Sequence, residues 1–415
     1  MAMSHDVVVV GGGASGMLAA GRAAEIGSRV SLLERNERLG RKLSITGNGR
    51  CNLTNAGDTA DFVRSFGRNG KFLYRALTEF SSRDLVAFFE ELEVKTKEEE
   101  DGRMFPASGS SESVVKALER YMRRRGVTVR LNCRVERILV DEAAGAVSGV
   151  RITGCQEVLR ADSVILATGG LSYPGTGSTG DGYSMAVELG HSIIPLRPAL
   201  VPLETEEEFA KGLQGLSLDS IEVAALANGR RFASESGDML FTHFGVSGPA
   251  VLALSALVVE HLDKGEKVEL SIHLISGLDA AGIERRLMDE ISGSGGKLLR
   301  TVMRRLMPNA LVPVLMGTCG IPEDRKCSQI TGGERKKLGT QLADFRLTVK
   351  RSRPIDEAII TRGGIRVGEI DPRTMESKKT RGLYFCGEII DIDARSGGYN
   401  LQAAFSTAHL AGTNA

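Results

Sequence analysis

Three glycines near the beginning of the chain have the spacing of a dinucleotide-binding turn. Gly11, Gly13 and Gly16 follow an apolar run at residues 7–10 and satisfy the pattern G-x-G-x-x-G. In such a turn the first glycine permits the bend, the second lets the backbone approach a pyrophosphate, and the third lets a helix pack close to the strand. An ordinary tight turn between a strand and a helix is the alternative interpretation.

The residues that follow complete this fingerprint. The helix that begins at Ala14 and Ser15 would direct unpaired N–H groups and the positive end of its dipole at phosphates. Glu34 and Arg35 follow a second apolar strand at residues 29–33. A carboxylate at this distance can accept hydrogen bonds from a ribose diol. A turn without a ligand does not account for Glu34, so the sequence predicts a dinucleotide site.

A loop at residues 40–55 combines glycines, cations and amides. The glycines allow the backbone to approach a ligand closely, the cations would pair with a diphosphate or an electron-rich ring, and the amides can hydrogen-bond a polar heterocycle. These residues are Gly47, Gly49, Arg41, Lys42, Arg50 and Asn52. Cys51 lies among them and is either a proton donor or a packed, inert thiol. A capped surface loop is the alternative for the whole segment.

Two later strand ends also carry candidate binding residues. They are Thr168, Gly169 and Gly170 after one strand, and Gly387, Glu388 and Gly398 after another. Ligands of open α/β folds bind at such carboxyl ends. Glu388 can accept a hydrogen bond from a sugar or ribityl hydroxyl. The helix after Gly398 would stabilise negative charge on a reduced flavin near N1. Capping and surface charge are the alternative for Glu388, Asp391 and Asp393.

Two other motifs support a cofactor or substrate site less strongly. The second G-x-G-x-x-G, at residues 175–180, follows Pro174 and no acid-tipped strand comes after it. We interpret it as a decoy, so a stable NAD(P)H domain is not supported. His243 lies in a glycine-bracketed loop at residues 241–249, where it is either catalytic or structural.

Composition excludes several classes of function. The chain has 415 residues, 42% of them hydrophobic and 25% charged, and its net charge of +1 favours neither a nucleic acid nor a membrane as a partner. Six cysteines without a C-x-x-C pair, and the absence of a recognisable signal peptide, fit the cytoplasm. The longest apolar stretch, residues 246–259, is too short to span a bilayer. A basic run at residues 285–305 is either a solvated helix face or a phosphate-binding surface.

The pattern of strands and helices predicts two domains. The first is α/β and discontinuous, formed by residues 1–195 and 345–415, and the second is inserted at residues 196–344. Helices are expected at residues 14–26, 81–92, 111–126, 182–190, 280–291, 297–306 and 400–410. Strands are expected at residues 127–131, 135–140, 146–152, 163–167, 200–203, 221–226 and 267–272, besides those named above.

These motifs together resemble one family, the HI0933-like (BaiN- or YhiN-type) FAD-dependent oxidoreductases. The resemblance runs nearly end to end and rests on the first fingerprint, the 40–55 loop, residues 173–182, 241–249 and 374–378, and the closing turn at residues 387–402. It implies a glutathione-reductase-like (Rossmann-type) FAD-binding domain with an inserted β-barrel and helical domain. Asn48 and Ala394 depart from glycines that are commoner in the family, which affects the substrate side more than FAD binding.

The resemblance also implies roles for individual residues. The first glycines would face the FAD pyrophosphate, Glu34 the adenosine ribose, and Val135 the adenine. Arg41, Lys42 and residues 47–52 would approach the diphosphate and the flavin. The ribityl chain and the flavin ring would contact Glu388 and the closing turn with Gly398, Tyr399, Asn400 and Leu401.

The function expected from this resemblance is hydride transfer through N5 of a tightly, non-covalently bound FAD. The donor would be NAD(P)H or an organic molecule. The acceptor would be an enone-like small molecule or a uridine of ribosomal RNA. Candidate catalytic residues are Cys51, Asn52, His243 and Tyr399. The alternatives are an amine oxidase, a non-catalytic flavin-binding sensor, and an NAD-dependent dehydrogenase. The oligomeric state stays open.

Overall fold

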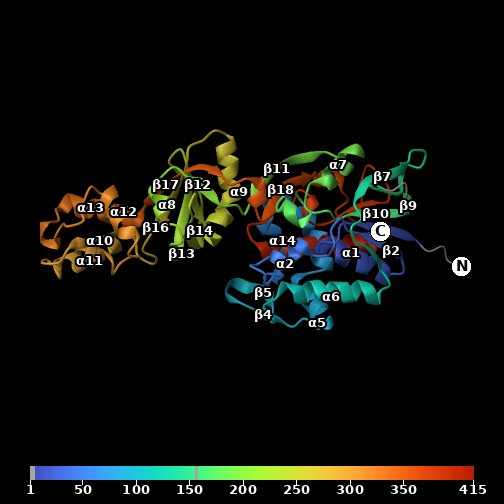
Figure 1. Cartoon of the computed structure of the whole chain (residues 1–415), viewed down its shortest axis with the longest axis horizontal. Helices are drawn as coiled ribbons and strands as arrows, with labels where there is room; N and C mark the ends of the chain where they lie inside the picture. Colours follow the sequence, from blue (N-terminus) through green and yellow to red (C-terminus); the bar gives the residue numbers. More distant parts are fainter. Residues whose placement is uncertain (1–4, 155–157) are drawn as a thin grey trace. The chain divides into compact units, whose positions relative to one another are not determined.

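The computed structural model describes residues 5–154 and 158–415 and divides into two compact units (Figure 1). Unit 1 consists of Met1–Arg197 and Ile359–Ala415, and unit 2 of Pro198–Ala358. Cys155, one of the six cysteines, lies outside the described residues. None of the helices formed by the described residues has the length and apolar character needed to cross a lipid bilayer.

Unit 1 is built on a five-stranded parallel sheet. Its strand order is β19 (Leu383–Phe385), β10 (Ser163–Leu166), β1 (Asp6–Val10), β2 (Arg29–Leu33), β6 (Thr128–Arg130). The four valines of β1 are all buried, as expected for a central strand covered on both faces. This arrangement places the carboxyl ends of β1, β10 and β19 side by side, where the predicted glycine motifs begin.

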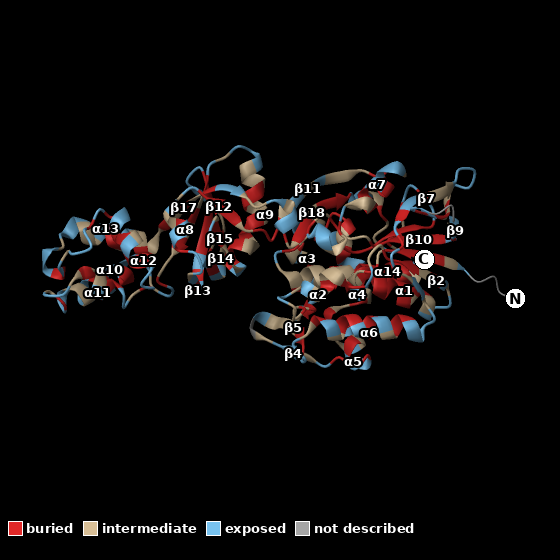
Figure 2. Cartoon of the chain, viewed as in Figure 1, coloured by how far each residue is buried: buried red, intermediate tan, exposed pale blue. Residues whose placement is uncertain are grey.

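Two helices pack closely because small residues separate them. α1 (Ala14–Glu25) contacts α14 (Gly397–Asn414), and a Cβ on Gly412 would lie only 2.5 Å from the carbonyl oxygen of Ala19. The other side of α1 contacts α6 (Ser111–Arg124), with the Tyr121 ring against Gly21. Figure 2 shows α1 as largely buried, which fixes the position of its N-terminus at the sheet edge.

Smaller sheets and short helices surround this core. Three sheets contain β7 (Val135–Asp141) with β8 (Ala146–Ile152) and β9 (Val158–Arg160), β3 (Thr54–Asn55) with β5 (Arg103–Pro106) and β4 (Thr96–Glu98), and β11 (Ile193–Ala199) with β18 (Ile360–Ile365). The short helices include α2 (Arg41–Ile45), α5 (Ser82–Glu91), η1 (Gly67–Leu73), α7 (Asp181–Glu188) and η7 (Gly387–Ile389).

Unit 2 combines a closed barrel with a helical part. The barrel order is β12 (Leu203–Thr205), β15 (Gly245–Ser247), β14 (Arg230–Phe241), β13 (Ser217–Ala227), β16 (Val268–His273), β17 (Phe345–Ser352). The helices are α8 (Phe209–Gly212), α9 (Pro249–Asp263), α10 (Ala280–Ser292), α11 (Leu299–Met303), α12 (Leu311–Thr318) and α13 (Gly332–Ala343). The predicted fold class, a Rossmann-type unit with a barrel and helices, is confirmed.

Several local predictions were wrong for identifiable reasons. Residues 345–352 form β17 of the barrel rather than the start of the returning domain, because they pair with β12 and β16, and the chain returns to unit 1 at Ile359. The strand expected at residues 200–203 is mostly a turn in which Leu200 has a positive φ of 51°. The helix expected at residues 297–306 covers only Leu299–Met303.

Candidate functional site

The three glycines of the first turn differ in what surrounds them. A Cβ on Gly11 would lie 2.5 Å from the carbonyl oxygen of Ala167, and one on Gly16 would lie 1.8 Å from that of Gly11. Gly11 also has a φ of 106°, which favours glycine. A Cβ on Gly13, by contrast, would have no heavy atom of the described residues within 4 Å apart from those of its chain neighbours. The first and third glycines therefore serve the bend and the packing, and the second faces open space.

The N-terminus of α1 begins beside this open space. Its N-cap is Gly13, which offers no side chain to the free N–H groups of the first turn, and no acidic residue occupies that turn. The same turn lies beside the start of η7, just after the strand β19, since a Cβ on Gly387 would lie 2.5 Å from Oγ of Ser15. Uncapped N–H groups next to a vacant glycine face are what a diphosphate requires.

Glu34 is held at the end of β2 by neutral donors. Its Oε2 accepts from the Gly12 N–H at 2.7 Å, and its Oε1 accepts from the backbone and side-chain nitrogens of Asn36 at 2.8 and 2.7 Å. The carboxylate is 7% exposed. Its remaining lone pairs are available to hydroxyl groups, and the bonds already made fix its orientation. Asn36 was missed by the sequence analysis because a single amide carries no pattern.

The second glycine motif, at residues 175–180, packs against Asn36, the residue that holds Glu34. A Cβ on Gly177 would lie 2.4 Å from Nδ2 of Asn36, and the same Nδ2 donates to the Thr176 carbonyl at 3.1 Å. Arg41 donates to Oδ1 of Asn36 at 2.9 Å. Arg35 is directed elsewhere, toward Asp181 at 3.0 Å. The loop at residues 175–180 thus supports Asn36 and, through it, Glu34.

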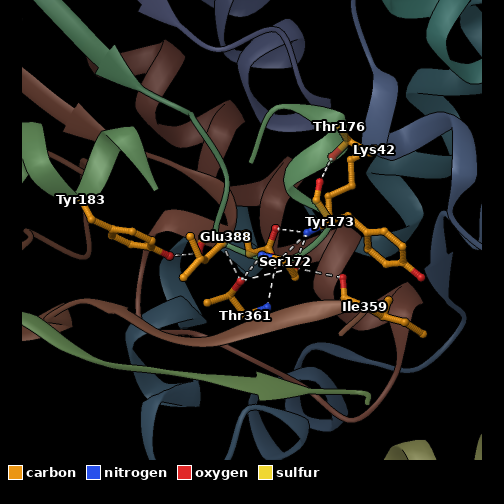
Figure 3. Close-up of polar contacts among 9 residues, drawn as sticks. Lys42, Ser172, Tyr173, Thr176, Tyr183, Ile359, Thr361 and Glu388 are labelled. Carbon is orange, nitrogen blue, oxygen red and sulfur yellow. Dashed lines mark hydrogen bonds and ion pairs between the residues drawn. The ribbon is translucent and has the colours of Figure 1, made fainter. Parts of the chain in front are cut away.

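Glu388 is the centre of a second polar cluster (Figure 3). Lys42 Nζ lies 2.9 and 2.7 Å from its two carboxylate oxygens, and the Thr361 N–H donates to Oε1 at 2.8 Å. Ser172 Oγ accepts from the same Nζ at 2.7 Å and donates to Oε1 at 3.2 Å. Lys42 and Glu388 are each 21% exposed, so the ion pair is largely covered.

Thr361 and Ser172 hold the loop after β10 in place. The Thr361 hydroxyl accepts from the backbone nitrogens of Leu171 and Ser172 at 2.8 and 3.0 Å. A Cβ on Gly170 would lie 2.4 Å from the same hydroxyl, which explains the glycine. The hydroxyl of Thr168 is buried and has no hydrogen-bond partner within residues 5–154 and 158–415. Neither Ser172 nor Thr361 belongs to a recognisable motif, so the sequence analysis missed both.

The loop at residues 47–52 meets the closing turn through Asn52. In the amide orientation that satisfies both neighbours, Asn52 donates to the Thr54 carbonyl at 3.0 Å and accepts from the Gly398 N–H at 3.3 Å. A Cβ on Gly398 would lie 2.9 Å from this amide. Arg50 pairs with Glu99 at 3.0 Å.

The other residues expected at the cofactor differ in how open their surroundings are: a Cβ on Gly49 would have no close neighbour among the described residues, whereas one on Gly47 would lie 3.0 Å from the Asn52 nitrogen. Gly47 and Gly49 both have positive φ, 57° and 80°. The Tyr399 ring meets Phe62 edge-on at 4.8 Å, and Val135 is only 4% exposed. Leu401 packs against the core, and Gly169 has a φ of 74°.

Cys51 and His243, two of the candidate catalytic residues, lie in contrasting surroundings. The Cys51 side chain is fully buried, and burial raises the pKa of its thiol to about 12, so it stays protonated at neutral pH. His243 is exposed in unit 2, where it lines a pocket of about 470 Å³ together with Phe244, Lys350 and Arg353. Their catalytic roles stay predictions.

The basic run at residues 285–305 is partly neutralised. Arg300 lies 3.7 Å from Glu323, and Arg305 lies 3.2 Å from Glu290. No cluster of three or more histidine, cysteine or acidic side chains suited to a metal ion occurs within the described part of the chain.

These features fit an FAD. The vacant face of Gly13 and the uncapped helix match a diphosphate, Glu34 matches a ribose, and Glu388 with the N-terminus of α14 matches a ribityl chain and a flavin ring.

Comparison with known proteins agrees with this geometry. Residues 5–414 match the model of the HI0933-like protein Rossmann domain. The chain is 33% identical to a 3-dehydro-bile acid delta(4,6)-reductase of Clostridium scindens over 98% of both proteins, and 32% identical to a ribosomal RNA dihydrouridine synthase of Haemophilus influenzae over 99% of this chain and 98% of the relative. Its fold is similar to that of a 3-ketosteroid delta1-dehydrogenase from Sterolibacterium denitrificans, with a TM-score of 0.56 and 14% identity over 99% and 98% of the two chains.

Proposed function

The chain belongs to the HI0933-like Rossmann-domain family and is an FAD-dependent oxidoreductase, and from this premise we propose that it reduces a carbon–carbon double bond conjugated to a carbonyl group. The observation that carries the proposal is the chemistry shared by two similar relatives. A delta(4,6)-reductase of 3-dehydro-bile acids and a dihydrouridine synthase both add two hydrogens across such a bond. The bond, rather than the molecule that contains it, defines the substrate class.

Binding of FAD is assigned to the two carboxylate clusters and the glycine turn between them. The N–H groups at the start of α1 would neutralise the diphosphate. Glu34 would orient the adenosine ribose, and Glu388, held by Lys42 and Thr361, would orient the ribityl chain. The N-terminus of α14 would stabilise negative charge on the ring.

FAD, when bound, supplies the hydride for the reduction. We expect the cofactor to be tightly bound, because hydrogen bonds hold Glu34 and Glu388, which are assigned to it, in fixed orientations. We expect it to be bound non-covalently, because the Cys51 thiol stays protonated. A reduced nicotinamide is proposed as a transient donor, because the glycine loop at residues 175–180 supports Asn36 instead of forming a second binding turn.

An anaerobic titration of the purified holoenzyme with NADPH and NADH tests the proposal. We expect the yellow flavin absorbance to bleach and to return when an enone such as 2-cyclohexen-1-one, or unmodified ribosomal RNA, is added. Recovery with RNA alone would identify a uridine as the substrate, and recovery with the enone alone would identify a small molecule.

Other outcomes would contradict the proposal. A flavin that is reduced only by an amine would indicate an amine oxidase. A flavin that no donor reduces would indicate a binding or sensory protein. A colourless protein that takes up no FAD would overturn the cofactor assignment.

A further inference from the structure

Two aspartates lie between Glu388 and the start of α14, and the FAD-binding roles given above use neither of them. Asp391 and Asp393 follow η7 directly. The side chain of Asp391 is 6% exposed and that of Asp393 is 23% exposed. One carboxyl group is therefore enclosed and the other remains accessible to solvent and to a small molecule.

Asp391 is fixed but incompletely satisfied. Its Oδ2 accepts from Nδ2 of Asn69 at 2.9 Å, and its backbone nitrogen donates to the Ile365 carbonyl at 3.0 Å. The Arg68 guanidinium is 3.6 Å from Oδ2. Oδ1 is buried and has no hydrogen-bond partner within the described part of the chain. The charge of a buried carboxylate with one unpaired oxygen interacts strongly with neighbouring groups, because little water lies between them to screen it.

The charge of Asp391 affects the pKa of Asp393. Burial is the largest effect and raises the pKa of its carboxyl, and the charge of Asp391 raises it further. Arg362, with Nε 3.8 Å from Oδ1, and Arg68 act in the opposite direction but do not cancel the rise. Asp393 therefore holds a proton at a higher pH than an ordinary aspartate does.

The turn that follows Asp393 is hydrogen-bonded to the first turn of α14. Oδ1 of Asn400 accepts from the Ala394 N–H at 3.0 Å, and its Nδ2 donates to the carbonyls of Ala394 and Ser396 at 2.9 and 2.7 Å. Asp393 therefore directly precedes a turn that is held by hydrogen bonds to Asn400 and that leads into α14, the helix assigned to the flavin ring.

We infer that Asp393 is the proton donor of the reaction and that Arg362, beside its carboxyl group, positions it. The inference rests on the proposed function. Reduction of the double bond adds a hydride, which carries two electrons, to one carbon, and a proton to the other. The proton leaves Asp393 as its O–H bond breaks and the new C–H bond forms. The carboxylate then regains a proton from solvent through its exposed edge.

The first test measures the reduction potential of bound FAD against pH in the holoenzyme. Reduction adds negative charge, so a nearby carboxyl takes up a proton and the potential depends more steeply on pH. Asp393→Asn should remove the additional pH dependence of the reduction potential. Asp391→Asn should shift the pH range in which that additional dependence occurs to lower pH. Asp371→Asn, which removes an aspartate paired with Arg373 elsewhere in unit 1, is the control and should match the wild type. Four identical curves would overturn the inference.

The second test follows oxidation of the dithionite-reduced holoenzyme by 2-cyclohexen-1-one and by unmodified ribosomal RNA. We expect Asp393→Asn to be slower by roughly 100-fold, as for loss of a general acid, and Asp393→Glu to regain part of the rate. An unchanged rate in Asp393→Asn would overturn the inference. If neither acceptor oxidises the wild-type enzyme, the proposed function fails, while the potential curves still show whether Asp393 exchanges a proton with the flavin site.

Discussion

Glu34 and Glu388 are both glutamates at strand ends, yet the chain holds them in different ways. Glu34 contacts Gly12 and Asn36, which are 22 and 2 residues away in sequence, and both are neutral donors. Glu388 contacts Thr361, Ser172 and Lys42, at separations of 27, 216 and 346 residues, and one of these donors is a cation. The first carboxylate belongs to a local motif, and the second exists as a site only in the completed fold.

The difference shows which part of a cofactor site tolerates change. A local site depends on backbone geometry, so it is sensitive to single atoms added to glycines. A site assembled from distant segments depends on a charge balance, so it is sensitive to the loss of its cation. The variants of Gly16, Gly13, Lys42 and Asn36 described below separate these two kinds of dependence.

The largest effect is expected at Gly16. Gly16→Ala would place a Cβ 1.8 Å from the Gly11 carbonyl oxygen, which belongs to the backbone and cannot move aside. We expect a loss of about 3 kcal/mol or more in the free energy of unfolding, together with loss of FAD, measured by chemical denaturation and flavin absorbance.

Gly13→Ala is the matched variant in the same turn. A Cβ at Gly13 meets no atom of the described residues beyond its chain neighbours, so stability should remain while affinity for FAD falls about tenfold or more, because the methyl group occupies the space assigned to the diphosphate. Equal FAD affinity in Gly13→Ala and the wild type would mean that the cofactor does not lie there.

The next largest effect is expected at Lys42. Lys42→Met leaves the Glu388 carboxylate with two neutral donors in a largely covered position. Loss of a charged hydrogen bond corresponds to roughly 1.5–3 kcal/mol, so we expect FAD affinity to fall by about 10- to 100-fold in an equilibrium titration. Lys116→Met, which breaks an exposed pair with Glu112, should leave it unchanged.

A smaller effect is expected when a neutral donor is removed from Glu34. Asn36→Ala deletes the side-chain hydrogen bond to Oε1, together with the weaker supports from Thr176 and Arg41, and keeps the two backbone donors to Glu34. The change should cost about 1 kcal/mol, or roughly fivefold in FAD affinity, measured by the same titration. A loss as large as that of Lys42→Met would mean that the two sites do not differ as described.

The last prediction is of a different kind and concerns a third carboxylate, Glu369, which contacts the distant Ser192 and the nearby Lys379. Burial raises its pKa, but the Ser192 N–H at 2.8 Å and Lys379 at 2.9 Å lower it to about 2, well below the usual value of 4.5. Its contribution to stability is complete above pH 4.5 and is lost as pH falls toward 2. Chemical denaturation should therefore show a difference in the free energy of unfolding between the wild type and Glu369→Gln at pH 6, and this difference should be smaller at pH 3. A difference in the free energy of unfolding that stays constant between pH 6 and pH 3 would contradict the lowered pKa of Glu369.

The sequence predicted the features that depend on near neighbours. The glycine turn and the parallel strands follow from spacing and from apolar runs, whereas the inserted barrel was expected from the resemblance to the family, and all three were identified correctly as parts of the fold. Asn36, Ser172 and Thr361 were missed because a lone polar residue acquires its role only when a distant segment lies beside it. For the same reason β17 was assigned to the wrong unit, since its partners β12 and β16 precede it by up to 150 residues.

The long separation between Lys42 and Glu388 has a consequence during synthesis of the protein. A ribosome that adds about 5–20 residues per second needs roughly 20–70 s to translate the 346 positions between them. During that interval the first glycine turn, β1 and β2 already exist, whereas α14 and the last strand of the sheet do not. The residues that we assign to the adenosine half of the cofactor are therefore synthesised first, and those that we assign to the flavin half follow only after the whole of unit 2 has been translated.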